Sequence, residues 1–258
     1  MSVTLKDYKG NVVDIGNQSN TLIGCIVGND NGHKIPFVGH DAQESTLLKF
    51  NDHIYLYYTK GEYINNVRYE SVVVAEYNPE TNTLVSDINI VANSSIFEIN
   101  ANIYKCSFFW VEGQYIYGIV SLWNGTLDSS DYINKCIMIK SSDALHFTLV
   151  SNNIVDNLFP PKFPNRWYGN HCVIKVSDSK WYWYIEIMTD VFWETYLIQS
   201  NSIESGWQLV GKCNIDSTPV GGVRGYLDND KIKILFHYGG LPTRLGYAEA
   251  EIKTPTIF

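Results

Sequence analysis

Ionisable side chains recur at one position of a repeated pattern along the chain. Counting eight residues back from the second residue of each predicted hairpin turn gives Glu44, Lys105, His171 and Gly222. A carboxylate such as Glu44 can act as a general base. An imidazole such as His171 can act as a general acid, because its usual pKa of about 6.5 lies near neutrality. These residue types indicate acid–base chemistry or polar recognition of a ligand at one shared site.

Further polar and aromatic residues lie near these positions. Two more carboxyl candidates are Asp41 and Glu186, the lone carboxylate of an aromatic strand. Arginine can orient hydroxyls or a carboxylate through its planar fork, and aromatic faces can stack on the C–H surfaces of sugars. The candidate ligand-binding residues are His40, Tyr104, Lys105, Arg166, Trp167, Asn170, Arg224 and His237. Such a cluster is typical of a sugar site, and it also occurs in a solvated polar channel.

A repeat predicts the elements that position these residues. Four segments each contain an apolar strand, a tight polar turn and a second strand with alternating aromatics: STLLKFNDHIYLYYT, SFFWVEGQYIYGIVS, CVIKVSDSKWYWYIE and GYLDNDKIKILFHYG. Their turn pairs are Asn51–Asp52, Glu112–Gly113, Asp178–Ser179 and Asn229–Asp230. Asn, Asp and Gly tolerate the positive φ of type I′ turns, so each segment is predicted to be a β-hairpin.

One or two further strands follow each hairpin, and no segment has a helical period of useful length. A period of about 50 to 65 residues of four-stranded antiparallel sheet is typical of a β-propeller. Residues 1–40 are expected to supply strands of one more blade, which closes the ring. We therefore predict an all-β, five-bladed β-propeller of four-stranded antiparallel blades in a single domain, residues 1–258, with four blades as the alternative.

The aromatic run KWYWYIEIMT covers residues 180–189. The second strand of a propeller blade is covered on both faces by neighbouring blades. The side chains of residues 181–184 are therefore expected to pack between sheets rather than to bind a ligand. Glu186, later on the same strand, is expected either at the rim or buried against a partner.

Composition limits the function classes. The formal net charge of −8, without a basic cluster, argues against nucleic-acid binding. No apolar run approaches the roughly 18–20 residues of a membrane span, and the first residues do not resemble a signal peptide. We expect a cytoplasmic or virion-associated protein. The five dispersed cysteines predict buried, reduced thiols. No cofactor is expected, although an axial Ca²⁺ or Na⁺ held through water and a histidine stays open.

Four motifs resemble those of the five-bladed glycoside hydrolases, a group that includes arabinanases, β-xylosidases and, more distantly, invertase-like enzymes. ESTLLKFNDHIYLYYT is similar to their opening blade, IKSSDALHFTLV and IQSNSIESGWQLV to later segments, and RLGYAEAE to a closing strand. The similarity spans roughly residues 36–252. It implies a propeller with an oligosaccharide or polysaccharide ligand at its axis.

The resemblance also implies three axial carboxylates: an Asp base, an Asp that tunes pKa and a Glu acid. One carboxyl protonates the leaving oxygen while another activates water. By position, the first falls on Glu44 with Asp41 as a rival, the second near Lys105 or Ser107, and the third on Asn170 or His171. Two of the three carboxylates are therefore missing.

Two function classes stay open. The first is a glycan-active enzyme with Asp41 or Glu44 as base and His171 or Glu186 as acid. The second is a non-catalytic glycan-binding module, such as a viral or bacterial attachment or surface-associated protein. Two carboxyl groups facing each other across the pocket favour the enzyme, and a single one favours the binder.

Overall fold

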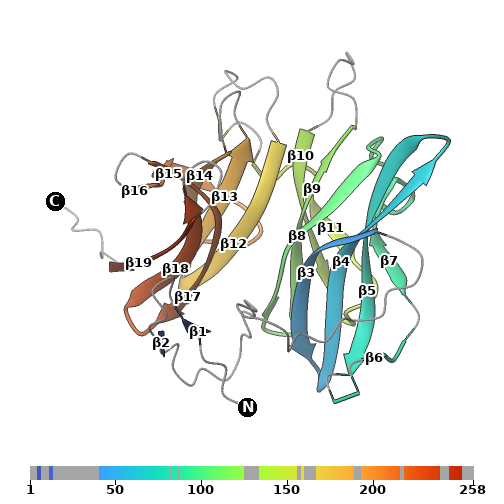
Figure 1. Cartoon of the computed structure of the whole chain (residues 1–258), viewed down its shortest axis with the longest axis horizontal. Coiled ribbons are helices and arrows are strands. Elements are labelled where there is room, and N and C mark those ends of the chain that lie inside the picture. Colours follow the sequence, from blue (N-terminus) through green and yellow to red (C-terminus); the bar gives the residue numbers. More distant parts are fainter. Residues whose placement is uncertain are drawn as a thin grey trace.

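The structure, a computed structural model, describes most of the chain beyond residue 40. The described residues are 5–6, 12–13, 41–78, 80–81, 83–86, 88–124, 134–155, 158–159, 167–188, 193–215, 218–238 and 244–251. Among them the only helix is the single turn α1 (Ser94–Phe97), and strands form the rest of the regular structure (Figure 1). No helix in these ranges is long and apolar enough to cross a membrane. The all-β prediction is confirmed.

The first two antiparallel blades share one sheet. Blade 1 contains β3 (Asp41–Phe50), β4 (His53–Ile64), β5 (Val67–Asn78) and β7 (Asn89–Ala92), with β6 (Thr83–Leu84) also paired to β5. Blade 2 contains β8 (Ile103–Glu112), β9 (Tyr115–Trp123), β10 (Asn134–Ser141) and β11 (Thr148–Ser151). One parallel bridge, between Glu70 of β5 and Ile103 of β8, joins the two blades.

The other two blades are separate four-stranded sheets. Blade 3 contains β12 (Trp167–Ser177), β13 (Lys180–Met188), β14 (Trp193–Ser200) and β15 (Gln208–Lys212). Blade 4 contains β16 (Asn214–Ile215), β17 (Thr218–Asp228), β18 (Lys231–Tyr238) and β19 (Arg244–Glu251). The first long strands of the blades meet in order: β3 contacts β8, β8 contacts β12, and β12 contacts β17. This is the arrangement expected of propeller blades around a common axis.

The predicted fifth blade falls on residues 1–40. These lie outside the described residues, apart from β1 (Leu5–Lys6) and β2 (Val12–Val13), which pair with each other. The number of blades therefore stays a prediction.

The positions of the hairpin turns follow the sequence signals with one correction, but among the four predicted turns only Asn51–Asp52 has positive φ at both turn residues. Asn51 and Asp52 have φ of 49° and 65°, as a type I′ turn requires. In blade 2, however, Glu112 pairs with Tyr115, so the turn is Gly113–Gln114 and not Glu112–Gly113. Gly113 has the positive φ of 60° as the first turn residue. The register predicted for this blade was therefore wrong by one residue.

Each innermost strand carries a β-bulge near its start. One extra residue is inserted between Gln43 and Thr46, between Cys106 and Phe108, between Tyr168 and His171, and between Gly221 and Arg224. A bulge re-aims the side chains beside it. The four bulges therefore change the direction of side chains at a similar level of each innermost strand, which is where the candidate site residues lie.

Blade 3 contains a second irregularity that affects the predicted site. In β12, Lys175 pairs with Trp181 while Ser177 pairs with Lys180, so Val176 is an extra residue near the turn. The sequence count of eight residues back from Ser179 did not include this extra residue, and it therefore selected His171. With Val176 included, the residue at the level of Glu44 is Asn170.

Hydrophobic cores fill the spaces between neighbouring blades. Trp181 and Trp183 pack toward blade 2, whereas Tyr184 packs toward blade 4. Side chains alternate between the two faces of a strand, and both faces of β13 are covered. The prediction that this aromatic run packs between sheets is confirmed. Cys136 and Cys172 are buried free thiols in these cores.

Candidate functional site

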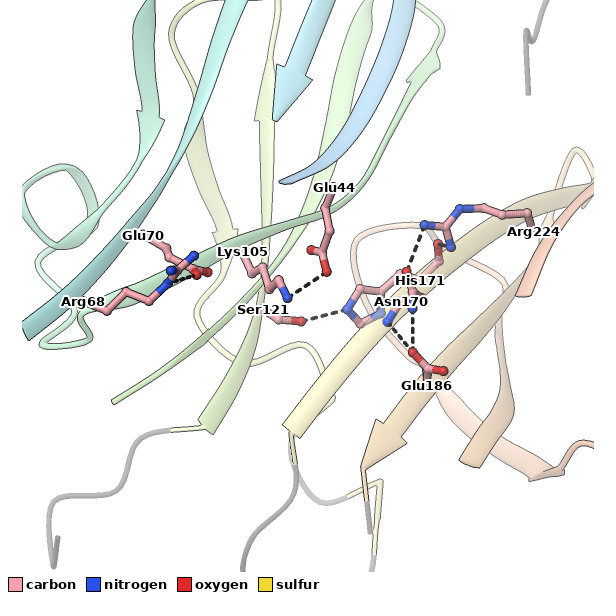
Figure 2. Close-up of polar contacts among 9 residues, drawn as sticks. All are labelled: Glu44, Arg68, Glu70, Lys105, Ser121, Asn170, His171, Glu186 and Arg224. Atoms are coloured by element: carbon pink, nitrogen blue, oxygen red, sulfur yellow. Dashed lines mark hydrogen bonds and ion pairs between the residues drawn. The ribbon is translucent and has the colours of Figure 1, made fainter. Parts of the chain in front are cut away.

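Four polar side chains from four different blades lie near the starts of the innermost strands. They are Glu44 of β3, Lys105 of β8, Asn170 of β12 and Arg224 of β17, and we call them the axial cluster. Figure 2 shows Glu44 and Lys105 meeting on one side and Asn170 and Arg224 meeting on the other.

Glu44 and Lys105 form an ion pair between blades 1 and 2. Lys105 Nζ lies 2.9 Å from Glu44 Oε1, and the two side chains are 26% and 31% exposed. Burial raises the pKa of the Glu44 carboxyl above its usual value, although the positive charge of Lys105 opposes the rise. Glu70 also raises this pKa and Arg224 lowers it, so both groups act on Glu44 electrostatically.

Arg224 is held by neutral oxygen atoms. Its Nη1 donates to the carbonyl oxygens of His171 and Val223 at 3.1 and 3.0 Å. Its Nη2 donates to Asn170 Oδ1 at 3.2 Å. In the described part of the chain no carboxylate lies within ion-pair distance of this guanidinium. These hydrogen bonds fix the orientation of the Arg224 side chain. Its positive charge has no direct counter-ion among the described residues.

Glu186 is a buried carboxylate, 3% exposed, that connects blades 3 and 4. It accepts hydrogen bonds from Asn170 Nδ2 at 2.6 Å, from Asn170 N at 3.1 Å and from Gly222 N at 2.9 Å. It lies on the same face of β13 as Tyr184, which explains why it faces blade 4. Glu186 therefore positions Asn170 from behind and does not face an open pocket.

The residue before Asn170, Gly169, cannot be replaced by a larger residue without a clash. A Cβ at Gly169 would lie 2.6 Å from Glu186 Oε2 and 2.6 Å from the Trp193 ring. Only a residue without a side chain lets the bulge of β12 approach the carboxylate this closely.

His171 is fully buried between blades 2 and 3 instead of facing the axis. Trp183 Nε1 donates to His171 Nδ1 at 3.1 Å, so the ring proton is assigned to Nε2, which lies 2.9 Å from Ser121 Oγ. Burial, and secondarily the charge of Arg224, hold the His171 pKa well below its usual range. The ring is therefore neutral and enclosed, and it lacks the proton and the access that a general acid needs.

The remaining predicted site residues are placed as follows. Tyr104 is buried in the core between blades 1 and 2, where its hydroxyl donates to the Ile99 carbonyl at 2.8 Å, so its ring offers no surface to a ligand. The residues His40 and Arg166, and the side chains of Asp41, Trp167 and His237, lie outside the described part of the structure.

Sequence reasoning missed an ion pair on β5. Arg68 Nε lies 2.6 Å from Glu70 Oε1, and Glu70 is 7% exposed. The other oxygen, Glu70 Oε2, is buried and has no hydrogen-bond partner in the described structure. The signal available in the sequence was the spacing of two residues, which places both side chains on one face of a strand.

No metal centre is found in the described ranges. They contain no group of three or more His, Cys, Asp or Glu side chains that could hold a metal ion. A pocket of about 310 Å³ lies at the outer edge of blade 3, and its lining contains no carboxylate and no aromatic ring. The axial cluster is therefore the best candidate site.

The chain resembles known proteins in its fold but not in its sequence. No family model matches the sequence, and no curated protein matches it. Among solved structures, a thermostable family-43 glycoside hydrolase matches with a TM-score of 0.58 and 11% identity over 83% of this chain and 72% of that chain. The fold is that of the β-propeller glycoside hydrolases.

Two further solved structures support the same fold. A family-32 β-fructofuranosidase from Bombyx mori matches with a TM-score of 0.56 and 14% identity over 83% of this chain and 47% of that chain. An α-L-arabinanase from Penicillium chrysogenum, complexed with arabinobiose, matches with a TM-score of 0.50 and 11% identity over 76% of this chain and 61% of that chain. The chain thus spans about half of the fructofuranosidase. Sequence identities this low support a shared fold, but they do not support a shared activity.

Proposed function

We propose that the chain binds an oligosaccharide at the axial cluster. One observation carries this proposal: of the candidate acids and bases whose side chains the structure describes, only Glu44 is accessible. Glu186 is enclosed by three hydrogen-bond donors, and His171 is neutral and buried. A single accessible carboxylate flanked by cations suits recognition of hydroxyl groups.

Each member of the cluster has a role in this proposal. Glu44 accepts hydrogen bonds from sugar hydroxyls, while Lys105 and Arg224 donate to hydroxyl or carboxylate oxygens. Asn170, held by Glu186, keeps Arg224 in place. Asp41, His40, Arg166, Trp167 and His237 stay predicted contributors.

Hydrolysis is a second candidate, and one observation favours it. Burial raises the pKa of Glu44, which is the direction that a glycosidase requires of its acid. In that case a second carboxyl group must act as the base, and Asp41 is the sequence candidate for it.

Calorimetric titration with arabinobiose, xylobiose and sucrose tests the proposal, with release of reducing sugar measured in parallel. Glu44→Gln removes a charge-assisted hydrogen bond, so affinity should fall about tenfold or more. The exposed Glu80→Gln is the matched control and should bind like the wild type. If Glu44→Gln binds normally but loses measurable turnover, hydrolysis is the function. If no sugar binds, or both variants bind like the wild type, the axial cluster is not a sugar site.

A further inference from the structure

The hairpin of β4 and β5 extends beyond the body of blade 1. The last pair described between β3 and β4 is Asp41 with Gly61. Beyond it β4 and β5 continue together for three more residue pairs, from Glu62–Tyr69 to Ile64–Val67. At 3.2–3.4 Å per residue this projection is about 10 Å long. We call residues 62–69 the arm.

The arm rises at the end of the blade where the axial cluster lies. Its base pairs with the start of β3, and Glu44 lies three residues after Asp41. The innermost strands of the other blades also begin at this level, with their bulges near their first residues. The base of the arm therefore lies beside the start of the strand that carries Glu44.

The two faces of the arm differ. Tyr63 pairs directly with Arg68, so these side chains share a face, and Glu70 lies two residues further on that same face. Ile64, Val67 and Tyr69 lie on the opposite face. We call the first the inner face, because it is directed toward blade 2: Val72, two residues beyond Glu70 on the same face of β5, packs in one core with Tyr104 and Phe109.

The inner face presents an aromatic ring at its outer end. Tyr63 is 68% exposed, and the Arg68 guanidinium lies over its ring, 5.5 Å from the centroid. Arg68 Nη1 also donates to the Tyr63 hydroxyl at 3.3 Å, while Nε is held by Glu70. Tyr63, Arg68 and Glu70 thus form a connected row that leads from the tip of the arm toward Glu44 and Lys105.

The base of the arm is fixed to blade 2, which makes the row a rigid surface. Glu70 N donates to the Asn102 carbonyl at 2.9 Å, and Asn102 Nδ2 donates to the Arg68 carbonyl at 2.8 Å. The parallel bridge between Glu70 and Ile103 adds to this attachment. A surface ordered in advance loses less conformational entropy when a ligand binds.

We propose that the inner face of the arm is a second glycan subsite, in which Tyr63 stacks on sugar units beyond those held by the axial cluster. This inference rests on the proposed function. An exposed tyrosine ring with polar neighbours can cover the apolar face of a sugar while the charged row meets its hydroxyls. The site therefore favours an oligosaccharide of several units over a mono- or disaccharide.

The test is the dependence of affinity on ligand length. Calorimetry is carried out with arabino-, xylo- and fructo-oligosaccharides of two to six units. The wild type should gain affinity with length for the series that it binds. Tyr63→Ala should keep the affinity for the disaccharide and lose about tenfold for the longest member, because one stacking platform is removed. Tyr63→Phe keeps the ring and should keep the gain.

Tyr69→Ala is the matched control, since it removes the same side chain from the opposite face. The subsite is ruled out if the wild type shows no gain with length, if Tyr63→Ala retains the gain, or if Tyr69→Ala removes it. A disaccharide that binds through Glu44 without a gain would overturn only the arm subsite. Absence of binding to all three series would overturn both proposals. Thermal unfolding of the Tyr63 variants should match the wild type, because the side chain is exposed.

Discussion

The carboxylate of Glu44 on β3 lies 2.9 Å from the ammonium group of Lys105 on β8, so opposite charges join blades 1 and 2 at their innermost strands. The resemblance to propeller glycoside hydrolases implied an aspartate near Lys105 in the second blade. A lysine at this place replaces repulsion between two carboxylates with attraction. The chemistry of the axial cluster therefore depends on this pair.

Removal of the lysine charge should raise the Glu44 pKa further. Lys105 lowers the Glu44 pKa, whereas burial and Glu70 raise it, so in Lys105→Met only the charge of Arg224 still opposes the rise. In a carboxyl NMR titration, the midpoint for Glu44 should move to higher pH than in the wild type. Lys49→Met, which breaks an exposed ion pair with Asp52, is the control and should leave that midpoint in place. A midpoint that is unchanged or lower in Lys105→Met would contradict the prediction.

The buried His171 should make the protein less stable in mild acid. Its folded-state pKa is depressed, so below about pH 6.5 the unfolded chain binds a proton that the folded chain does not. Its effect on stability is absent above that pH. As the pH falls to 5.5, the free energy of unfolding should drop by on the order of 1 kcal/mol because of His171.

Urea unfolding at pH 7.5 and 5.5 measures this effect. His171→Gln keeps polar atoms beside Ser121 and Trp183 without a group that titrates. The difference in the free energy of unfolding between the two pH values should therefore shrink by on the order of 1 kcal/mol. The exposed His146→Gln should leave the His171 contribution intact. Equal pH dependence in His171→Gln and the wild type would show that His171 takes up a proton in the fold as readily as in the unfolded chain.

Gly169→Ala should damage the support of the axial cluster. The added methyl would lie 2.6 Å from both Glu186 Oε2 and the Trp193 ring, so both side chains, or the backbone at Gly169, would have to move. We expect a loss of about 1–3 kcal/mol in the free energy of unfolding, measured with urea. Gly211→Ala is the matched control, because its Cβ meets nothing within 4 Å. If both variants lose the same free energy of unfolding, the close contacts at Gly169 add no cost of their own, which would contradict the prediction.

Local sequence determined the strands, the hairpins and the aromatic walls between blades. Asn51–Asp52 specifies its turn because both residues tolerate positive φ. The run from Trp181 to Tyr184 identifies a strand covered on both faces, since alternate aromatic residues need burial on each side. These signals act over a few residues, so they can be recognised without knowledge of the partner strand.

The composition of the axial cluster was decided by tertiary structure. Val176, inserted in β12, moved the site position from His171 to Asn170. Because successive side chains on a strand face opposite ways, a one-residue shift decides whether a group faces the axis or a neighbouring blade. The partners of Glu186 and of Glu44 come from other blades, and only the packing of the blades brings them together.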